Sequence, residues 1–264
     1  MGKSLQEQYT DDMHDRFGGY FAAWTPGSPL AVGDVGVLDG NAFTRLSTLK
    51  EKKVPFSVLQ DSSSETIGPF VSDRKTSVSF KASGTVSPPN SKLSAADAGF
   101  SIQFARDYAT VFVAQDCRQP SIEDQLALEP ILIDLYEKGE WNKGWHVVSQ
   151  VVNAKSCTVF VSQSKQGAID LKVNGPITAP NAPLIDLGSA SAQLSITWSQ
   201  NLAVQMVTKP ATPLVKLVHL KGLFGKRLAT ALAAPHAAAM DFLTPEMIRS
   251  DKKLRQLLRL VEAG

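Results

Sequence analysis

The sequence predicts an α+β protein with a mainly antiparallel sheet. Two observations lead to this class. In several segments, apolar and polar residues alternate with a period of two, which is typical of strands with one buried face. In other segments apolar residues recur at helical spacing, and clusters of Gly, Pro, Ser and Asn separate the segments as turns do. The 264 residues provide ample apolar material for a large core.

The first 50 residues are expected to form a helix followed by short strands. Ser4 is a candidate cap for a helix that runs to about Arg16 and that Gly18-Gly19 stop. Between residues 26 and 49, frequent Gly and Pro separate the apolar runs VGVL and AFTRL, which predict strands joined by turns.

A first alternating group occupies residues 76–104. TSVSFKASGTV and GFSIQFA alternate, and the polar connection SPPNSKLSAADA separates them, so they are candidates for a hairpin. The more apolar YATVFVAQDC predicts a strand covered on both faces. A helix is expected from Pro120-Ser121 to Gly139, and Pro130 should kink or split it.

A second alternating group, residues 158–174 with 190–207, also consists of two segments that could pair as a hairpin. WHVVSQVV, CTVFVSQS and AIDLKVN predict three strands, and a Pro-rich loop spans 175–188. SASAQLSITWSQNLAVQMV (189–207) then alternates over a far longer stretch than the usual strand of about 5 or 6 residues. TPLVKLVHL predicts a further strand.

The tail has a different character. The Ala-rich segment around Pro235 predicts part helix and part exposed linker. Thr244-Pro245 then predicts the start of an amphipathic helix, with Thr as the cap and Pro in its first turn. Its apolar positions are Met247, Leu254, Leu257, Leu258 and Val261.

Composition narrows the function classes. The formal net charge of +2 is too small to indicate a nucleic-acid partner, and two cysteines give no disulfide framework. The N-terminus has no apolar signal-peptide core, and no segment is apolar enough for a membrane helix, so we expect a cytoplasmic protein. Acidic residues exceed basic ones at the N-terminus, and basic residues predominate after residue 216.

The sequence predicts no enzyme. It contains no phosphate-binding loop, nucleophile elbow, His-Glu-x-x-His or Cys-x-x-Cys motif, and we expect no cofactor and no metal site. His146 and His219 fall in predicted strands, where structural roles are the usual ones. A thiol-dependent hydrolase using Cys117 with His146 is the weakest of three functional interpretations.

The alternation itself has two interpretations. A membrane β-barrel needs strands of about 9–11 residues with an apolar outer face and a polar lumen, which both alternating groups offer if they are extended. In water these residues would form shorter strands with the apolar face hidden. An ordinary α+β sheet explains the same alternation.

The chain also resembles the short bacterial and fungal gasdermins. The resemblance rests on GDVGVLDGNAFTRLSTLKEKKVPF, AGFSIQFARDYATVFVAQDC, YEKGEWNKGWHVVSQVVNAKSCTVFVSQS and NLAVQMVTKPATPLVKL. It implies a twisted sheet with surrounding helices, and two segments, about 60–110 and 158–207, that refold into membrane-spanning hairpins. The hairpin candidates are Val78, Phe80, Phe100, Ile102, Phe104, Val159, Val161, Ile169, Leu171, Leu194, Ile196, Trp198, Leu202 and Val204.

The resemblance further implies a pore-forming domain at 1–232, a cleavable linker at 233–243 and a C-terminal inhibitory helix within 244–264. The helix's apolar stripe would hold the chain inactive until a protease cuts within Ala238, Ala239, Met240, Asp241, Phe242 and Leu243. The monomer would then form a homo-oligomer.

Lipid contact is expected, with acidic lipids as the partner, from Lys216, Lys221, Lys226 and Arg227, or from Lys75 and Lys81. The chain differs from the family in lacking a cysteine before Cys117 and in having an acidic first helix. The expected function is a cytoplasmic pore-former that inserts into the inner face of the cell membrane and kills the cell. The alternative is a non-enzymatic binding module with an amphipathic docking tail.

Overall fold

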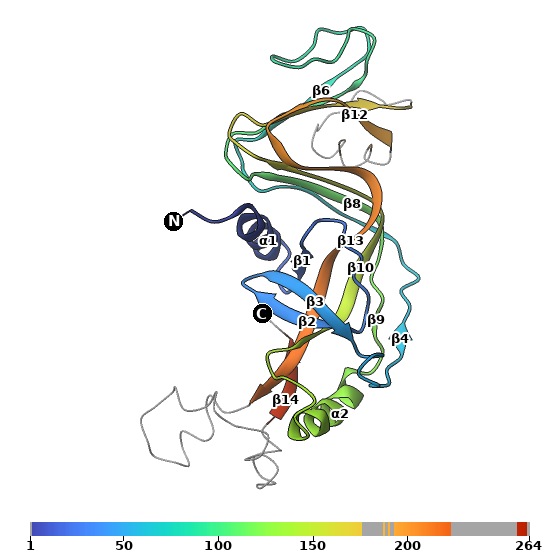
Figure 1. Cartoon of the computed structure of the whole chain (residues 1–264). Coiled ribbons are helices and arrows are strands. Elements are labelled where there is room, and N and C mark those ends of the chain that lie inside the picture. Colours follow the sequence, from blue (N-terminus) through green and yellow to red (C-terminus); the bar gives the residue numbers. More distant parts are fainter. Residues whose placement is uncertain (1, 176–186, 188–189, 191–192, 223–257, 263–264) are drawn as a thin grey trace.

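The computed structural model describes residues 2–175, 187, 190, 193–222 and 258–262, and it confirms the α+β class with mainly antiparallel sheets (Figure 1). Two helices, α1 (Leu5–Arg16) and α2 (Gln125–Glu137), accompany two sheets in these residues. The strands are β1 (Phe21–Ala23), β2 (Asp34–Asp39), β3 (Ala42–Thr48), β4 (Val58–Leu59), β5 (Glu65–Val71), β6 (Ser77–Lys81), β7 (Gly99–Gln103), β8 (Thr110–Arg118), β9 (Ser121–Ile122), β10 (His146–Ser162), β11 (Ala168–Val173), β12 (Leu194–Gln200), β13 (Leu202–Gly222) and β14 (Leu258–Glu262).

Helix α1 begins as the sequence predicts. The Ser4 hydroxyl accepts a hydrogen bond from the Glu7 backbone N–H at 3.2 Å, and the Glu7 carboxylate accepts one from the Ser4 N–H at 2.6 Å. This reciprocal capping box satisfies N–H groups that have no partner within the helix. Tyr9 and Met13 on its buried face pack against strands β8 and β10.

The larger sheet has the strand order β14-β13-β1-β3-β2-β10-β8-β5, and β13 also pairs with β10. Strands β13, β1, β3, β2 and β10 therefore form a closed circuit of pairings. Four of these strands share a core cluster of Phe21, Phe43, Val148, Val151, Val215 and Leu217. Helix α2 packs at the end of the molecule where β14 also lies (Figure 1).

The smaller sheet has the order β12-β11-β7-β6, and it continues the larger one. Strand β12 leads into β13, β10 into β11, β7 into β8, and β5 into β6. The continuing strands keep the same neighbours, since β13-β10-β8-β5 and β12-β11-β7-β6 have the same spatial order. Four strands of the larger sheet and the smaller sheet therefore form one four-stranded ribbon with a bend, and we call the small sheet its distal part.

The distal part has one apolar and one polar face. Phe100, Ile102, Ile169 and Leu171 are buried in one cluster with Val111 and Phe160 of the larger sheet. Ser77, Ser79, Ser101 and Asp170 occupy alternate positions, and the segment 82–98 covers part of that face. The alternation read from the sequence is thus the alternation between these two faces.

Three predicted elements need correction. WHVVSQVV and CTVFVSQS form a single strand, β10, and α2 begins at Gln125 and runs through Pro130 as one helix. The predicted C-terminal helix is wrong for Leu258 and Val261, because residues 258–262 form β14 and pair antiparallel with β13. Pairing with a sheet edge here overrides local helix propensity. The linker 233–243, the cleavage region and the rest of that predicted helix lie outside the described residues.

The long alternating stretch is also divided. Strand β12 ends at Gln200, and β13 begins after Asn201, which has a φ of +49°. A bulge places Ile196 opposite Leu171 and Trp198 opposite Asp170. Because opposite residues share a face, Ile196 and Trp198 lie on different faces, and the predicted single apolar face does not extend through this stretch.

Candidate functional site at the bend of the ribbon

The bend consists of four short connections that lie side by side. They are residues 72–76 (β5 to β6), 104–109 (β7 to β8), 163–167 (β10 to β11) and Asn201 (β12 to β13). Backbone hydrogen bonds join neighbours, from Phe104 N–H to the Gly167 carbonyl at 2.8 Å and from Gln163 N–H to the Asn201 carbonyl at 2.7 Å. The chain thus bends all four strands at one level.

Two of these connections contain residues in a sparsely populated backbone region. Tyr108 has a φ of +56° and Asn201 a φ of +49°. Non-glycine residues adopt positive φ infrequently, at a cost on the order of 1 kcal/mol or more, and the surrounding structure must compensate. Since Tyr108 N–H bonds to the Ser162 carbonyl at 3.1 Å, the bend itself supplies part of that compensation.

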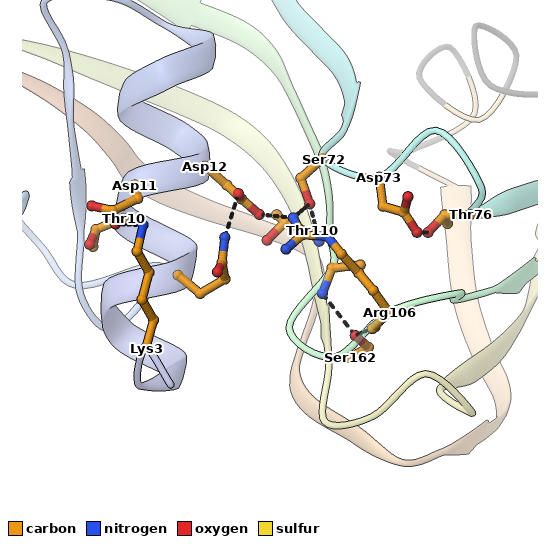
Figure 2. Close-up of polar contacts among 12 residues, drawn as sticks. Lys3, Thr10, Asp11, Asp12, Ser72, Asp73, Thr76, Arg106, Thr110 and Ser162 are labelled. Atoms are coloured by element: carbon orange, nitrogen blue, oxygen red, sulfur yellow. Dashed lines mark hydrogen bonds and ion pairs between the residues drawn. The ribbon is translucent and has the colours of Figure 1, made fainter. Parts of the chain in front are cut away.

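Arg106 occupies the centre of the polar contacts at the bend (Figure 2). Its Nη2 donates to the Asp12 carboxylate of α1 at 2.6 Å and to the Ser72 hydroxyl at 2.8 Å. The second Asp12 oxygen accepts from Gln8 Nε2 at 2.8 Å. The Asp12 and Arg106 side chains are 13% and 33% exposed, so that water screens their interaction only in part.

Ser72 and Ser162 connect this ion pair to the strands. The Ser72 hydroxyl accepts from Thr110 N–H at 2.9 Å, at the start of β8. The Ser162 hydroxyl, at the end of β10, donates to the Arg106 carbonyl at 2.8 Å and accepts from Ala109 N–H at 2.9 Å. One arginine therefore joins α1 to three of the four strands at the bend.

Segment 82–98 covers part of the polar face of the distal part. Lys81 is 1% exposed, and its Nζ donates to the carbonyls of Ala82, Ala95 and Asp97 at 3.2, 3.2 and 2.8 Å. Asp170, fully buried on β11, accepts from the Ser91 hydroxyl at 3.0 Å and from Lys92 N–H. The expectation that Lys81 contacts lipid from the surface is wrong for this conformation.

The structure brings most hairpin candidates together in the distal cluster. This cluster contains Val78, Phe80, Phe100, Ile102, Phe104, Ile169, Leu171, Leu194 and Leu202. Val159, Val161 and Val204 instead pack with α1 residues in a second cluster. Ile196 is 39% exposed and Trp198 is half-buried. The candidates thus divide between two layers.

The structure describes some of the residues proposed to contact lipid or to form the inhibitory tail, and the others lie outside the described residues. Lys216 lies on β13 with its Nζ 5.0 Å from the centre of the Tyr20 ring, a cation–π contact. Lys221 lies opposite Arg259 in the β13–β14 pairing. Lys226, Arg227, Met247, Leu254 and Leu257 lie outside the described residues.

The pair proposed for thiol chemistry is separated. Cys117 lies opposite Ala154 on β10, eight residues from His146, which corresponds to a separation on the order of 25 Å. Burial raises the pKa of Cys117 to about 11 and also raises the pKa of Cys157, which disfavours the reactive thiolate. His146 instead faces His219 across the β10–β13 pair, with ring centres 4.7 Å apart.

Metal clusters and membrane-spanning helices are two further kinds of candidate in the described part of the chain. It holds no group of three or more His, Cys, Asp or Glu side chains suited to a metal ion. No helix within it is both long and apolar enough to cross a membrane. The candidate functional site consists of the bend and its contacts with α1.

Sequence reasoning missed Asp12, Ser72, Arg106 and Asp170. Asp12 and Arg106 lie far apart in the sequence, and neither belongs to a motif. Asp170 carried a weak signal, because a carboxylate inside the apolar run AIDLKV needs a buried partner.

No protein-family model matches this chain, and comparison with curated proteins also gives no match.

Proposed function

We propose that the protein is an autoinhibited pore-former of the gasdermin type, in which the bent ribbon straightens and its distal part enters a membrane. The observation that carries this proposal is the shared strand order on the two sides of the bend. Straightening would create four long strands, 65–81, 99–118, 146–173 and 194–222, without exchanging any neighbour.

The two faces of the distal part suit such a transition. A membrane barrel needs an apolar face toward lipid and a polar face toward the lumen. The distal part has both, with the apolar face now packed on the larger sheet and part of the polar face under segment 82–98. Refolding would move the apolar face from contact with the larger sheet to contact with lipid, and both environments are apolar.

Strand length explains why refolding is needed. Strands β6 and β7 have five residues each, β11 has six and β12 has seven. A membrane-spanning strand needs about 9–11 residues. To cross a membrane, each of these strands must therefore become longer, by including residues of the bend or residues beyond its other end.

The C-terminal segment is the proposed inhibitor, and the structure changes how it would act. Residues 258–262 pair with Val218–Gly222 and cover that edge of β13. Cutting within 238–243 would release this strand and leave backbone groups of β13 unpaired, which favours pairing with another chain. We expect a monomer before cleavage and a membrane-bound homo-oligomer afterwards, on the inner face of the cell membrane, causing cell death in defence against phage or in non-self recognition.

The test is dye release from acidic and neutral liposomes, using the full chain with a specific protease site introduced within 238–243. We expect leakage only after cutting, and more from acidic vesicles. A folded, cut protein that releases no dye from either would contradict the proposal. Loss of binding to a partner on cutting would then favour the alternative, a binding module.

A second arm tests the strand pairing without cleavage. Since successive strand residues direct their N–H groups to opposite sides, Arg259→Pro combined with Leu260→Pro removes at least one bond to β13. We expect this uncut variant to leak. The matched control, Arg259→Ala with Leu260→Ala, keeps the backbone donors and should leak less.

A further inference from the structure

The side chain of Arg106 joins groups that straightening of the ribbon would separate. Its guanidinium bonds to Asp12 on α1 and to Ser72 on the β5–β6 connection. Arg106 and Ser72 belong to connections whose backbone must change when the bend opens, whereas Asp12 belongs to a helix held on the larger sheet by Tyr9 and Met13. The geometry of these three residues therefore depends on the bend.

Breaking the contact would be costly, because its groups are largely removed from water. The Asp12 side chain is 13% exposed, and both of its carboxylate oxygens have donors. A carboxylate that loses its cation at such a site keeps much of its desolvation penalty. The bent conformation consequently has a contact that opposes separation of α1 from the bend.

We propose that Asp12, Arg106 and Ser72 form a latch that holds α1 against the bend and must open before the ribbon straightens. This inference rests on the proposed function for its link to membrane activity. It adds a second restraint to that function, at the bend and separate from the β14 pairing. Release of the C-terminal segment is then necessary for activity but does not set its rate. The opening of the latch sets that rate.

The chain provides a matched control on the same helix. Asp11 is adjacent to Asp12 and also forms an ion pair, with Lys3 Nζ at 2.7 Å. The Lys3–Asp11 pair is more exposed, at 60% and 25%, and Asp11 contacts Asn41 and no residue of the bend. Asp11→Asn and Asp12→Asn thus remove the same charge from neighbouring positions, and only the second removes the latch.

The first measurement is hydrogen–deuterium exchange of the uncut chain, which does not depend on any pore. For Asp12→Asn we expect exchange in 72–76, 104–109 and the middle of α1 to rise about tenfold, and for Asp11→Asn to stay close to the original chain. If Asp12→Asn leaves the exchange of the two connections unchanged, the latch is wrong.

The second measurement is the leakage rate after cutting, with the same liposomes as above. We expect Asp12→Asn and Arg106→Gln to leak about tenfold faster than the cut original chain, and Asp11→Asn to leak at the original rate. Equal rates in all variants would overturn the role of the latch in opening. If the cut original chain itself does not leak, the proposed function fails, and the exchange result alone decides whether the latch exists.

A charge-reversed pair distinguishes loss of the latch from general damage to the fold. Asp12→Arg combined with Arg106→Asp restores opposite charges at the same positions. We expect this double variant to exchange and leak less than either single reversal, because the two charges attract again. Double and single variants with the same high exchange would show that damage to the fold, and not loss of a latch, explains the effect.

Discussion

The two cysteines show how position in the sheet determines reactivity. Cys117 and Cys157 are fully buried in the cluster beneath α1. We predict that iodoacetamide at pH 8 modifies neither thiol in the folded protein and both after unfolding, since burial disfavours the thiolate. The number of modified thiols, measured by mass spectrometry, checks this, and rapid modification of either thiol in the folded chain would refute it.

The Cys117 thiol also predicts a pH dependence. Its pKa is raised by burial from 9.0 to about 11 in the folded state, so the unfolded chain loses this proton first as pH rises. The contribution of the thiol to stability is complete below about pH 9 and decreases between pH 9 and 11. The free energy of unfolding should therefore decrease less over this range in Cys117→Ala than in the original chain, as measured by urea titration.

Gly99 is a residue that the register of the distal part requires. A Cβ at this position would lie 1.9 Å from the Leu171 carbonyl oxygen. We predict that Gly99→Ala lowers the free energy of unfolding by about 2 kcal/mol, the usual range for overpacking. Gly18→Ala is the control, because nothing lies within 4 Å of its added Cβ. Similar urea midpoints for the two variants would contradict the β7–β11 pairing.

At the scale of elements, segment 82–98 is joined to β11 by charge. Asp97 accepts from the Ser94 hydroxyl at 2.6 Å and from Lys172 Nζ at 2.9 Å. The Ser94 hydroxyl first, and then Lys172, lower the pKa of Asp97 to about 2 from 3.8. The stability that this contact contributes is therefore complete above about pH 4, decreases below it, and is lost as pH falls through about 2.

The contact between Asp97 and Lys172 can be tested directly by titrating the Asp97 carboxyl group. The carboxyl carbon resonance of Asp97 should titrate near pH 2 in the original chain. In Lys172→Gln the midpoint should rise but stay below 3.8, because the Ser94 bonds remain. An unchanged midpoint in this variant would mean that Lys172 does not contact Asp97 in solution.

The elements also show what a sequence can predict. Local signals were sufficient for the Ser4 cap and for the strand pairs 77–81 with 99–103 and 168–173 with 194–200, because caps and alternation depend on adjacent residues. They were insufficient for residues 258–262, where the edge of β13 imposes a strand on a segment with helical spacing. The latch was not predictable, since Asp12 and Arg106 become neighbours only after folding.

At the scale of the whole molecule, the central feature is one ribbon with a bend. Four strands cross the bend without changing neighbours, and a single arginine joins α1 to the connections there. The predicted β-strand groups are therefore confirmed as paired strands, whereas their entry into a membrane stays a prediction. We expect entry to bring the apolar face of the distal part against lipid.

The most direct measurement is an environment-sensitive dye attached in turn to single cysteines at Ile102 and Gln103 of β7, with both native cysteines replaced by alanine. Ile102 is already buried in the apolar cluster of the uncut protein, so contact with lipid is detected by a quencher attached to the acyl chains of acidic liposomes. After cutting, we expect this quencher to quench the dye at position 102 and the dye at position 103 to report water, because the two positions lie on opposite faces. If the acyl-chain quencher has no effect on the dye at position 102 after cutting, the distal part does not enter the membrane and the central claim is wrong.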